Sequence, residues 1–284
     1  MADFSDQFQR FIFEHGNIRG ERVMLDASSR EALGKRDYPA PVAQMLGESL
    51  AAVVLMSATL KFEGLLSLQA RGSGSVSLLM AESNHQRQIR GLAHSEPEVG
   101  PGTLAEHLGD GRLAITIEPR HGQRYQGVVP LEDETLSQCL ESYFERSEQL
   151  ATAIILASDG ARAGGLLLQR LPGESAPDGD FWNRLTLQAR TVTADELLLL
   201  DAETLLRRLF PEDAVRLYPP EPVVFACSCS RERTAQALEA LGEEDCIALL
   251  DEQGVISVDC QFCHHHYEFD RQDVTVLFQQ PPLH

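Results

Sequence analysis

Two short stretches of sequence, FACSCSRER at residues 225–233 and CQFC at residues 260–263, decide how the C-terminal part of this chain folds. They contain two close pairs of cysteines: Cys227 and Cys229, then Cys260 and Cys263. A turn that carries two cysteines offers two thiolates to a metal ion, and a folded insert between two such turns brings four ligands together. The pattern predicts a tetrahedral site that holds one Zn²⁺ per chain. Four buried, reduced cysteines are the less favoured alternative, because burial alone does not require paired spacing.

The thirty residues between the two pairs have the pattern of a folded insert. Ser230 is suited to cap a helix that ends at Gly242, and a second helical segment follows. Residues 255–259 then alternate as a strand that leads into Cys260. A module of about sixty residues with so few large apolar side chains is marginally stable alone, and a bound metal is a usual remedy.

Charge and coordination number limit the chemistry of this site. Four thiolates leave Zn²⁺ with excess negative charge, which Arg231, Arg233 and the helix amides after Ser230 are placed to offset. Four ligands also fill the coordination shell, whereas a hydrolytic zinc centre keeps one position open for water. The sequence has no phosphate-binding loop, nucleophile elbow or H-E-x-x-H motif. We therefore expect no catalytic residues and no enzymatic activity.

Other cysteines and histidines are weaker candidates for the metal site. His264, His265 and His266 directly follow the last cysteine ligand and can compete for the metal, although such a run is more often at the surface. Cys139 and Cys246 fall on the apolar faces of predicted helices. We interpret both as small core side chains.

The first 172 residues alternate between helical and strand patterns. Apolar residues recur at helical spacing from Pro41 to Lys61 and along one face of residues 135–147. Period-two alternation separated by turn residues predicts antiparallel pairs of strands: 66–70 with 76–80, 113–117 with 125–129, and 150–157 with 163–170. These patterns predict an α+β fold in which helices accompany an antiparallel sheet.

Two breaks divide the rest of the chain. PGESAPDGD at residues 172–180 is rich in proline, glycine and acidic residues, and residues 181–210 then have the pattern of short, leucine-rich helices. YPPEP at residues 218–222 comes before the cysteines. We predict three parts: an N-terminal α+β core domain at residues 1–172, a helical linker region at 173–222, and a small C-terminal four-cysteine zinc-binding domain at 223–284.

The charge balance argues against two classes of partner. The chain carries 43 acidic and 24 basic residues, a net charge of −19. Such a charge repels phosphate backbones and anionic lipids, so we expect neither nucleic acid nor membrane as a partner. The N-terminus lacks the pattern of a secretory signal, and the longest aliphatic run, Leu50 to Met56, is too short to span a bilayer. We expect a cytoplasmic protein, in which six cysteines favour metal or redox chemistry over permanent disulfides.

With these features in view, the chain resembles the 33 kDa chaperonin family of redox-regulated bacterial heat-shock chaperones. Residues 225–233 are similar to that family's first zinc half-site, and residues 260–263 with Tyr267 and Phe269 are similar to the second. Further similar segments cover most of the chain: residues 19–20, 37–39, 58–64, 122–130, 143–149 and 163–169. The run from His264 to His266 departs from the small or polar residues more usual in the family.

The resemblance implies an ATP-independent holdase whose reduced, zinc-bound form is inactive. In the family, oxidants form disulfides within each pair, here Cys227–Cys229 and Cys260–Cys263. Zinc then leaves, the C-terminal redox-switch domain and the linker unfold, and the protein dimerises and holds unfolding client proteins. Zinc-bound thiolates are reactive toward oxidants, and metal binding contributes roughly 10–16 kcal/mol in small zinc modules, so its loss should unfold the module. We expect the leucine-rich face of residues 181–210 to become client-binding surface.

Two rival functions stay open at this point. A zinc knuckle that binds nucleic acid or a protein partner usually carries a basic face, whereas residues 223–284 hold 3 basic and 11 acidic residues. A thiol oxidoreductase would use Cys260-x-x-Cys263 as its active pair, but the sequence lacks the strand-to-helix context of such enzymes.

Overall fold

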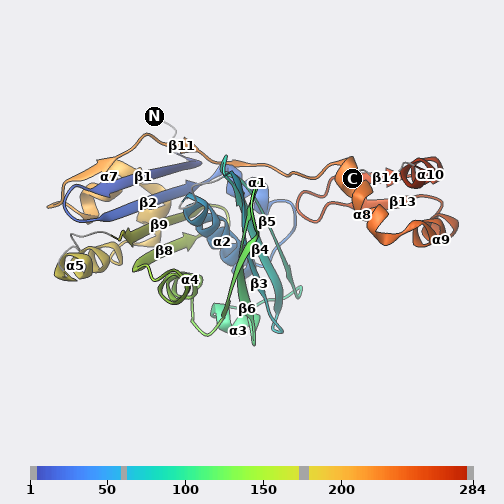
Figure 1. Cartoon of the computed structure of the whole chain (residues 1–284). Helices are drawn as coiled ribbons and strands as arrows, with labels where there is room; N and C mark the ends of the chain where they lie inside the picture. The colour runs from blue at the N-terminus through green and yellow to red at the C-terminus, as the bar shows by residue number, and fades with distance from the viewer. Residues whose placement is uncertain (1–4, 59–62, 173–178, 280–284) are drawn as a thin grey trace. The chain divides into compact units, whose positions relative to one another are not determined.

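The computed structural model describes residues 5–58, 63–172 and 179–279. The chain divides into two compact units, Met1–Ala226 and Cys227–His284 (Figure 1). Most of the domain boundary predicted at residues 172–180, namely 173–178, lies outside the described residues. Residues 59–62 of the family-like segment 58–64 also lie outside them. The three-part division predicted from the sequence stays a prediction.

The first unit contains a six-stranded sheet whose strand pairs are all antiparallel. Its central path runs β10-β1-β2-β9-β8, and β11 also pairs with β1. The strands are β1 (Gln7–Phe13), β2 (Ile18–Leu25), β8 (Thr152–Ser158), β9 (Ala163–Arg170), β10 (Val215–Leu217) and β11 (Glu221–Pro222). The pair predicted from residues 150–157 and 163–170 is confirmed as the hairpin of β8 and β9, with Ser158 opposite Ala163.

A second sheet of six strands completes the α+β architecture, which confirms the predicted fold class. Its order is β12-β5-β4-β3-β6-β7, and the β12–β5 pair is parallel. The strands are β3 (Gly64–Arg71), β4 (Val76–Asn84), β5 (Gln88–Ser95), β6 (Arg112–Pro119), β7 (Tyr125–Pro130) and β12 (Val224–Phe225). The two remaining predicted pairs are confirmed, since β3 pairs with β4 and β6 pairs with β7.

Helix α2 (Ala40–Ala58) lies between the two sheets and contacts strands of both (Figure 1). Every residue from Ser49 to Ala58 is buried, because sheets cover the helix on both sides. By length and composition, α2 is also the one helix among the described residues that could cross a membrane. Its most apolar window is 67% buried inside the unit, as in the core helix of a globular domain.

Three shorter helices complete this part of the unit: α1 (Ala27–Leu33), α3 (Leu104–Leu108) and α4 (Leu136–Tyr143). Thr103 and Thr135 are the N-caps of α3 and α4. Both form capping boxes, in which the side chains of Glu106 and Gln138 accept a hydrogen bond from the backbone amide of the cap residue. The α-helix predicted at residues 135–147 is shorter than expected. It ends at Tyr143, and a π-helical turn follows from Phe144 to Glu148.

The leucine-rich segment forms three helices that cover the other face of the first sheet: α5 (Gly179–Ala189), α6 (Ala194–Leu199) and α7 (Ala202–Leu209). Their buried leucines pack against β1 and β9 in a second apolar core: Leu185, Leu197, Leu198, Leu205, Leu206 and Leu209. Phe13 and Phe210 meet edge to face there, with ring centroids 5.0 Å apart. Strand β9 is buried from Ala163 to Gln169, because α2 covers one of its faces and these helices cover the other.

The second unit is a small module with its own core. It contains helices α8 (Arg231–Leu241), α9 (Glu243–Gln253) and α10 (Arg271–Gln279), and a hairpin of β13 (Ile256–Asp259) and β14 (His266–Phe269). Ser230 caps α8 by accepting a hydrogen bond from the Arg233 amide at 3.2 Å, as predicted. Only six buried side chains form the described core of this unit: Leu238, Cys246, Leu250, Ile256, Phe269 and Val274.

Candidate metal centre

Two backbone turns of the second unit position the four cysteines. Cys227 and Cys229 lie in the loop just before α8, whose first turn is fixed by the Ser230 cap. Cys260 and Cys263 lie in the turn that connects β13 to β14. Two hydrogen bonds of 2.9 Å close that turn, from the Cys260 amide to the His265 carbonyl and from the His264 amide to the Cys260 carbonyl.

The structure brings the four cysteine sulfur atoms together, within 4.8 Å of one another. The Sγ atoms of Cys227 and Cys260 are 3.6 Å apart, and those of Cys229 and Cys263 are 3.4 Å apart. A tetrahedron with Zn–S bonds of about 2.3 Å has edges of about 3.8 Å, so these separations fit four ligands around one ion. Among the described residues, no other group of three or more histidines, cysteines or carboxylates is arranged to hold a metal ion.

The sulfur cluster favours a cation for electrostatic reasons. Burial, reinforced by hydrogen bonds with the other sulfur atoms, raises the pKa of the Cys263 thiol to about 12. Closely packed thiolates repel one another, and a divalent cation removes that penalty by binding the ionised form. Tyr267 contributes from β14, where its hydroxyl donates a hydrogen bond of 3.3 Å to the Cys229 sulfur. This donor supports negative charge on the sulfur. The family resemblance places Tyr267 with the second cysteine pair, but its hydrogen bond to Cys229 of the first pair was not predicted from the sequence.

The two arginines near the first cysteine pair connect parts of the module through hydrogen bonds and a salt bridge. Arg231 donates to the Glu268 carbonyl and forms a salt bridge of 2.7 Å with Asp273, and its guanidinium stacks over Phe269. Arg233 donates to the carbonyl and hydroxyl oxygens of Ser228, the residue between the first two cysteines. Arg231 therefore ties α8 to α10, whereas Arg233 fixes the first cysteine turn.

The three histidines lie outside the group of potential ligands. His266 contacts carboxylates through both ring nitrogens, with Nδ1 2.7 Å from Asp259 and Nε2 3.3 Å from Glu268. These hydrogen bonds raise the pKa of His266 above its usual value. The ring of His265 meets Tyr267 edge to face at 4.6 Å, and His264 is exposed and takes a left-handed φ of 57° that closes the turn.

The two remaining cysteines are core residues, as predicted. Cys139 is 1% exposed in α4, and Cys246 is fully buried in the core of the second unit. Burial raises the pKa of Cys139 to about 11 and also raises that of Cys246. Both stay protonated at neutral pH, which makes them poor ligands and poor nucleophiles.

Comparison with known proteins identifies the family. Residues 6–270 match the family model described as Hsp33 protein, which spans both units. The chain belongs to the Hsp33 family. Several Hsp33 relatives, each named 33 kDa chaperonin, are about half identical to it. The protein of Pseudomonas paraeruginosa is 53% identical over 281 residues, which cover 96% of this chain and 95% of the relative. The Azotobacter vinelandii protein is 52% identical, with 98% and 96% covered.

A solved structure of the same family supports the fold. The crystal structure of the 33 kDa chaperonin (heat shock protein 33 homologue) from Thermotoga maritima superposes with a TM-score of 0.81 over 96% of this chain and 98% of that one. At 20% identity this likeness concerns the fold alone. The named Hsp33 relatives are chaperonins, which are not enzymes, and the prediction of a non-enzymatic protein is thereby confirmed.

Proposed function

We propose that this chain is a redox-regulated, ATP-independent chaperone that holds unfolding proteins under oxidative stress. One observation carries the proposal: four sulfur atoms converge at two turns of a unit whose described core contains only six buried side chains. Membership of the Hsp33 family, whose relatives are named chaperonins, supports the chaperone activity. The geometry of the cysteines supports its control by metal and oxidant.

The first step of the proposed switch is that Zn²⁺ holds the second unit folded. Cys227, Cys229, Cys260 and Cys263 would bind one ion per chain in the reduced state. The ion would supply a closed tetrahedral link between the loop before α8 and the β13–β14 turn. Such binding contributes roughly 10–16 kcal/mol in small zinc modules, more than this core can replace.

The second step is oxidation of the thiolates. A zinc-bound sulfur is already in the nucleophilic form. Two thiolates would lose two electrons to hypochlorous acid and form one disulfide, while the oxidant becomes chloride and hydroxide. By analogy with the family, the bridges are Cys227–Cys229 and Cys260–Cys263. Each cysteine turn would then close on itself, no thiolates would remain for the ion, and zinc would leave.

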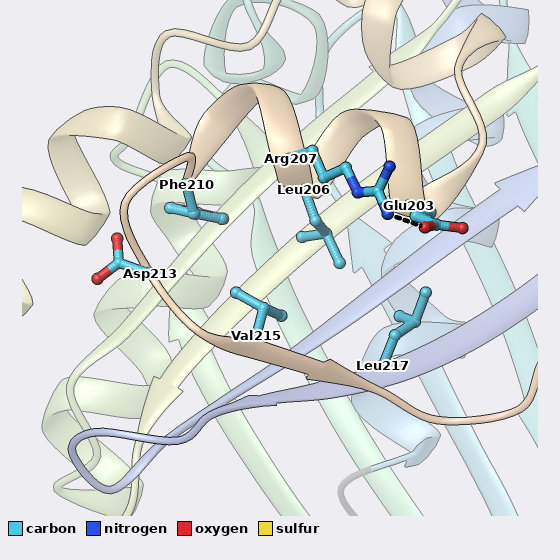
Figure 2. Close-up of a pocket in the computed structure, with 7 residues that line it drawn as sticks. All are labelled: Glu203, Leu206, Arg207, Phe210, Asp213, Val215 and Leu217. Atoms are coloured by element: carbon cyan, nitrogen blue, oxygen red, sulfur yellow. Dashed lines mark ion pairs between the residues drawn. The ribbon is translucent and has the colours of Figure 1, made fainter.

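The third step is exposure of apolar surface for clients. A groove of about 460 Å³ lies between the α7 segment and β10. In Figure 2, Leu206 and Phe210 of the α7 segment face Val215 and Leu217 of β10. Helices α5 to α7 bury most of their leucines against the first sheet, so release of these helices would expose a large apolar face. We propose this face as the binding surface for unfolded clients and for a second, oxidised copy of the chain.

The charge distribution supports this function over a nucleic-acid-binding zinc knuckle. Two of the three arginines of the second unit form salt bridges with carboxylates, Arg231 with Asp273 and Arg271 with Asp251. Within residues 227–279, which the structure describes, the module thus lacks the free basic face that phosphate binding requires. The net charge of −19 would instead keep client complexes in solution and away from nucleic acid and anionic membranes. We propose that the protein acts in the cytoplasm.

The fold also disfavours a thiol oxidoreductase. In a thiol oxidoreductase, the reactive cysteine pair lies at the start of a helix that follows a strand, and the helix lowers the pKa of the nucleophilic cysteine. Cys260 and Cys263 lie between two strands of a hairpin instead. Turnover of a dithiol substrate by the reduced protein would be needed to revive that function.

The decisive experiment treats zinc-loaded protein with hypochlorite and follows zinc release together with aggregation of a thermally unfolding client. We expect zinc release and protection to rise together in the wild type and in the control variant Cys246→Ala. The variant Cys260→Ser should lose stoichiometric zinc and the oxidant response. If zinc leaves while the client aggregates as before, the switch is refuted. Equal protection by the reduced form would refute redox control but leave holdase activity standing.

A further inference from the structure

Residues 223–226, directly before the first cysteine of the metal centre, lie along one edge of the second sheet. Within them, β12 contains only Val224 and Phe225, whereas β5 beside it runs for eight residues. Without β12, β5 would be the outermost strand at this end of the sheet. An outermost strand presents backbone N–H and C=O groups with which another extended chain can pair.

Two main-chain hydrogen bonds hold the segment to β5. The Val224 amide donates to the Arg87 carbonyl at 3.2 Å, and the Ala226 amide donates to the Ile89 carbonyl at 3.0 Å. These bonds use only backbone atoms, so an extended chain of almost any sequence can form them. Ile89 is fully buried in the main core, and departure of the segment would leave its carbonyl oxygen without this donor.

The side chains of the segment alternate between the core and solvent. Val223 is 1% exposed and belongs to the main apolar core, and Phe225 packs against the same core. Val224 between them is 46% exposed. Helix α1 contacts both β5 and β12, and the Lys35 ammonium lies 4.9 Å from the centre of the Phe225 ring. The segment thus has the features of an added strand, in which main-chain bonds and alternate side-chain pockets act together.

The length of open edge limits what can bind there. Further along β5, the Ala93 amide donates to the Tyr38 hydroxyl at 3.2 Å, so that part of the strand already has a partner. Alternate residues of a strand direct their backbone groups to the same edge, and Ala93 is in phase with Arg87 and Ile89. The edge that a ligand can use therefore lies within residues 87–92. It suits a short extended peptide segment.

We propose that residues 223–226 occupy a binding site for extended segments of unfolded client proteins while the protein is reduced. This inference rests on the chaperone function proposed above. Ala226 is bonded directly to Cys227, so unfolding of the second unit would free this end of the segment. A client strand with apolar side chains two residues apart would then donate its amides to the Arg87 and Ile89 carbonyls. The site belongs to the second sheet, whereas the apolar face of α5 to α7 packs on the first.

The variant Val224→Pro tests the site in zinc-loaded, full-length protein, without oxidation. Proline removes the amide hydrogen that bonds to Arg87, whereas the control Val224→Ala keeps the amide and changes only an exposed side chain. The probe is the peptide EPVVFA, which has the sequence of residues 221–226 and carries an N-terminal fluorescein and a C-terminal amide. By fluorescence anisotropy, it should bind Val224→Pro about tenfold more tightly than Val224→Ala or the wild type, because the tethered segment no longer competes.

A second variant and a spectroscopic readout guard against a folding defect. Phe225→Ala removes one apolar contact of the segment but leaves its backbone intact, so it should also bind the peptide more tightly than the wild type. Amide chemical shifts should move at residues 87–92 when the peptide binds. The melting temperature of each variant, measured in parallel, shows that it is folded. Equal peptide affinity in the wild type and both released variants would overturn the proposal.

Two altered peptides test how the edge recognises its ligand. N-methylation at the second valine removes the donor to the Arg87 carbonyl and should weaken binding about tenfold. The peptide EPITLA keeps the apolar spacing with different side chains and should bind about as well as EPVVFA. Binding of EPVVFA alone would show a contact private to this chain and would overturn the client site.

Competition with a client separates this inference from the chaperone function itself. After hypochlorite treatment of the wild type, excess EPVVFA should reduce protection of a thermally unfolding client, whereas the N-methylated peptide should not. Client protection that EPVVFA leaves unchanged would refute the edge as a client site and leave holdase activity standing. Peptide binding by the released variants, together with no client protection by oxidised protein, would refute the chaperone function and keep the edge as a peptide-binding site.

Discussion

Arg87 donates two hydrogen bonds to one carboxylate oxygen of Glu221, from Nε at 3.1 Å and from Nη2 at 2.8 Å. The guanidinium is buried and stacks over the Phe8 ring at 3.8 Å from its centroid. Glu221 belongs to β11, six residues before Cys227. The Arg87–Glu221 contact attaches β11 to the first unit a few residues before the metal centre begins in sequence. The pairing of β12 with β5 is a second attachment of the same segment.

This anchor predicts the effect of Glu221→Gln. The variant leaves a buried guanidinium without its counter-charge, but Glu221 itself is about half exposed, so we expect a loss of about 1 kcal/mol in unfolding free energy. Amide exchange at Val223 and Val224 should accelerate, because Val224 donates to the Arg87 carbonyl. In the control Glu14→Gln, which breaks an exposed pair with Arg216, stability should change by only a few tenths of a kcal/mol. Equal effects in both variants would refute the anchor.

Glu21 predicts a pH dependence of stability. It is 1% exposed on β2, and burial raises its pKa to about 7 despite Arg19, Arg10 and Arg87 nearby. The folded state therefore binds a proton that the unfolded state has released, and this stabilisation is present below about pH 4.5 and lost as pH rises through 7. Between pH 5 and 8, urea denaturation should show the wild type losing about 3 kcal/mol relative to Glu21→Gln. Parallel pH profiles for the two proteins would contradict this.

Metal removal should unfold the second unit and leave strands β1 to β9 and helix α2 of the first unit folded. A chelator at neutral pH, or Cys260→Ser, should abolish amide protection in residues 227–279 because their small core cannot compensate for the lost ion. Protection of β1 to β9 and α2 should persist, since their cores contain none of the four cysteines. Hydrogen exchange followed by mass spectrometry measures both regions in one sample. Retained protection throughout residues 227–279 would show that the metal does not hold this unit folded.

Tyr267→Phe tests the hydrogen bond to the Cys229 sulfur. Loss of the hydroxyl donor removes a group that stabilises the Cys229 thiolate, so the affinity for zinc should fall about tenfold. Zinc release on treatment with hypochlorite should also become faster. Competition with a chromogenic chelator gives the affinity. Tyr218→Phe, in the first unit, serves as the control and should leave both quantities unchanged.

Cys246→Ala separates the buried cysteine from the four at the metal centre. The sulfur lies in the core and contacts the Leu238 carbonyl at 3.5 Å, so its removal should cost about 1 kcal/mol of stability in the second unit. Zinc stoichiometry and the oxidant response should not change. If thiol titration of the native, metal-bound variant found one zinc-protected thiol fewer than in the wild type, Cys246 would be assigned to the metal site.

Local sequence rules predicted most elements correctly where neighbouring residues determine them. Ser230 forms the predicted cap of α8, and alternation predicted the β8–β9 hairpin, because capping and pleating depend on residues close in sequence. The same rules missed the π-helical turn after Tyr143 and the short strands β10 to β12. Those strands exist because distant residues supply their partners, as Phe11 does for Leu217.

The sequence by itself determined the four-cysteine pattern, the α+β class and the family resemblance, because ligand spacing and hydrophobic period are properties of the chain. The role of the four cysteines as zinc ligands stays a proposal, but the convergence of their sulfur atoms within 4.8 Å follows from the folded insert that connects the two pairs. Only the tertiary structure decided that Arg231 pairs with Asp273, that Tyr267 reaches Cys229, and that β12 pairs with β5. These relationships join residues far apart in sequence, and only packing of the elements against one another places them together.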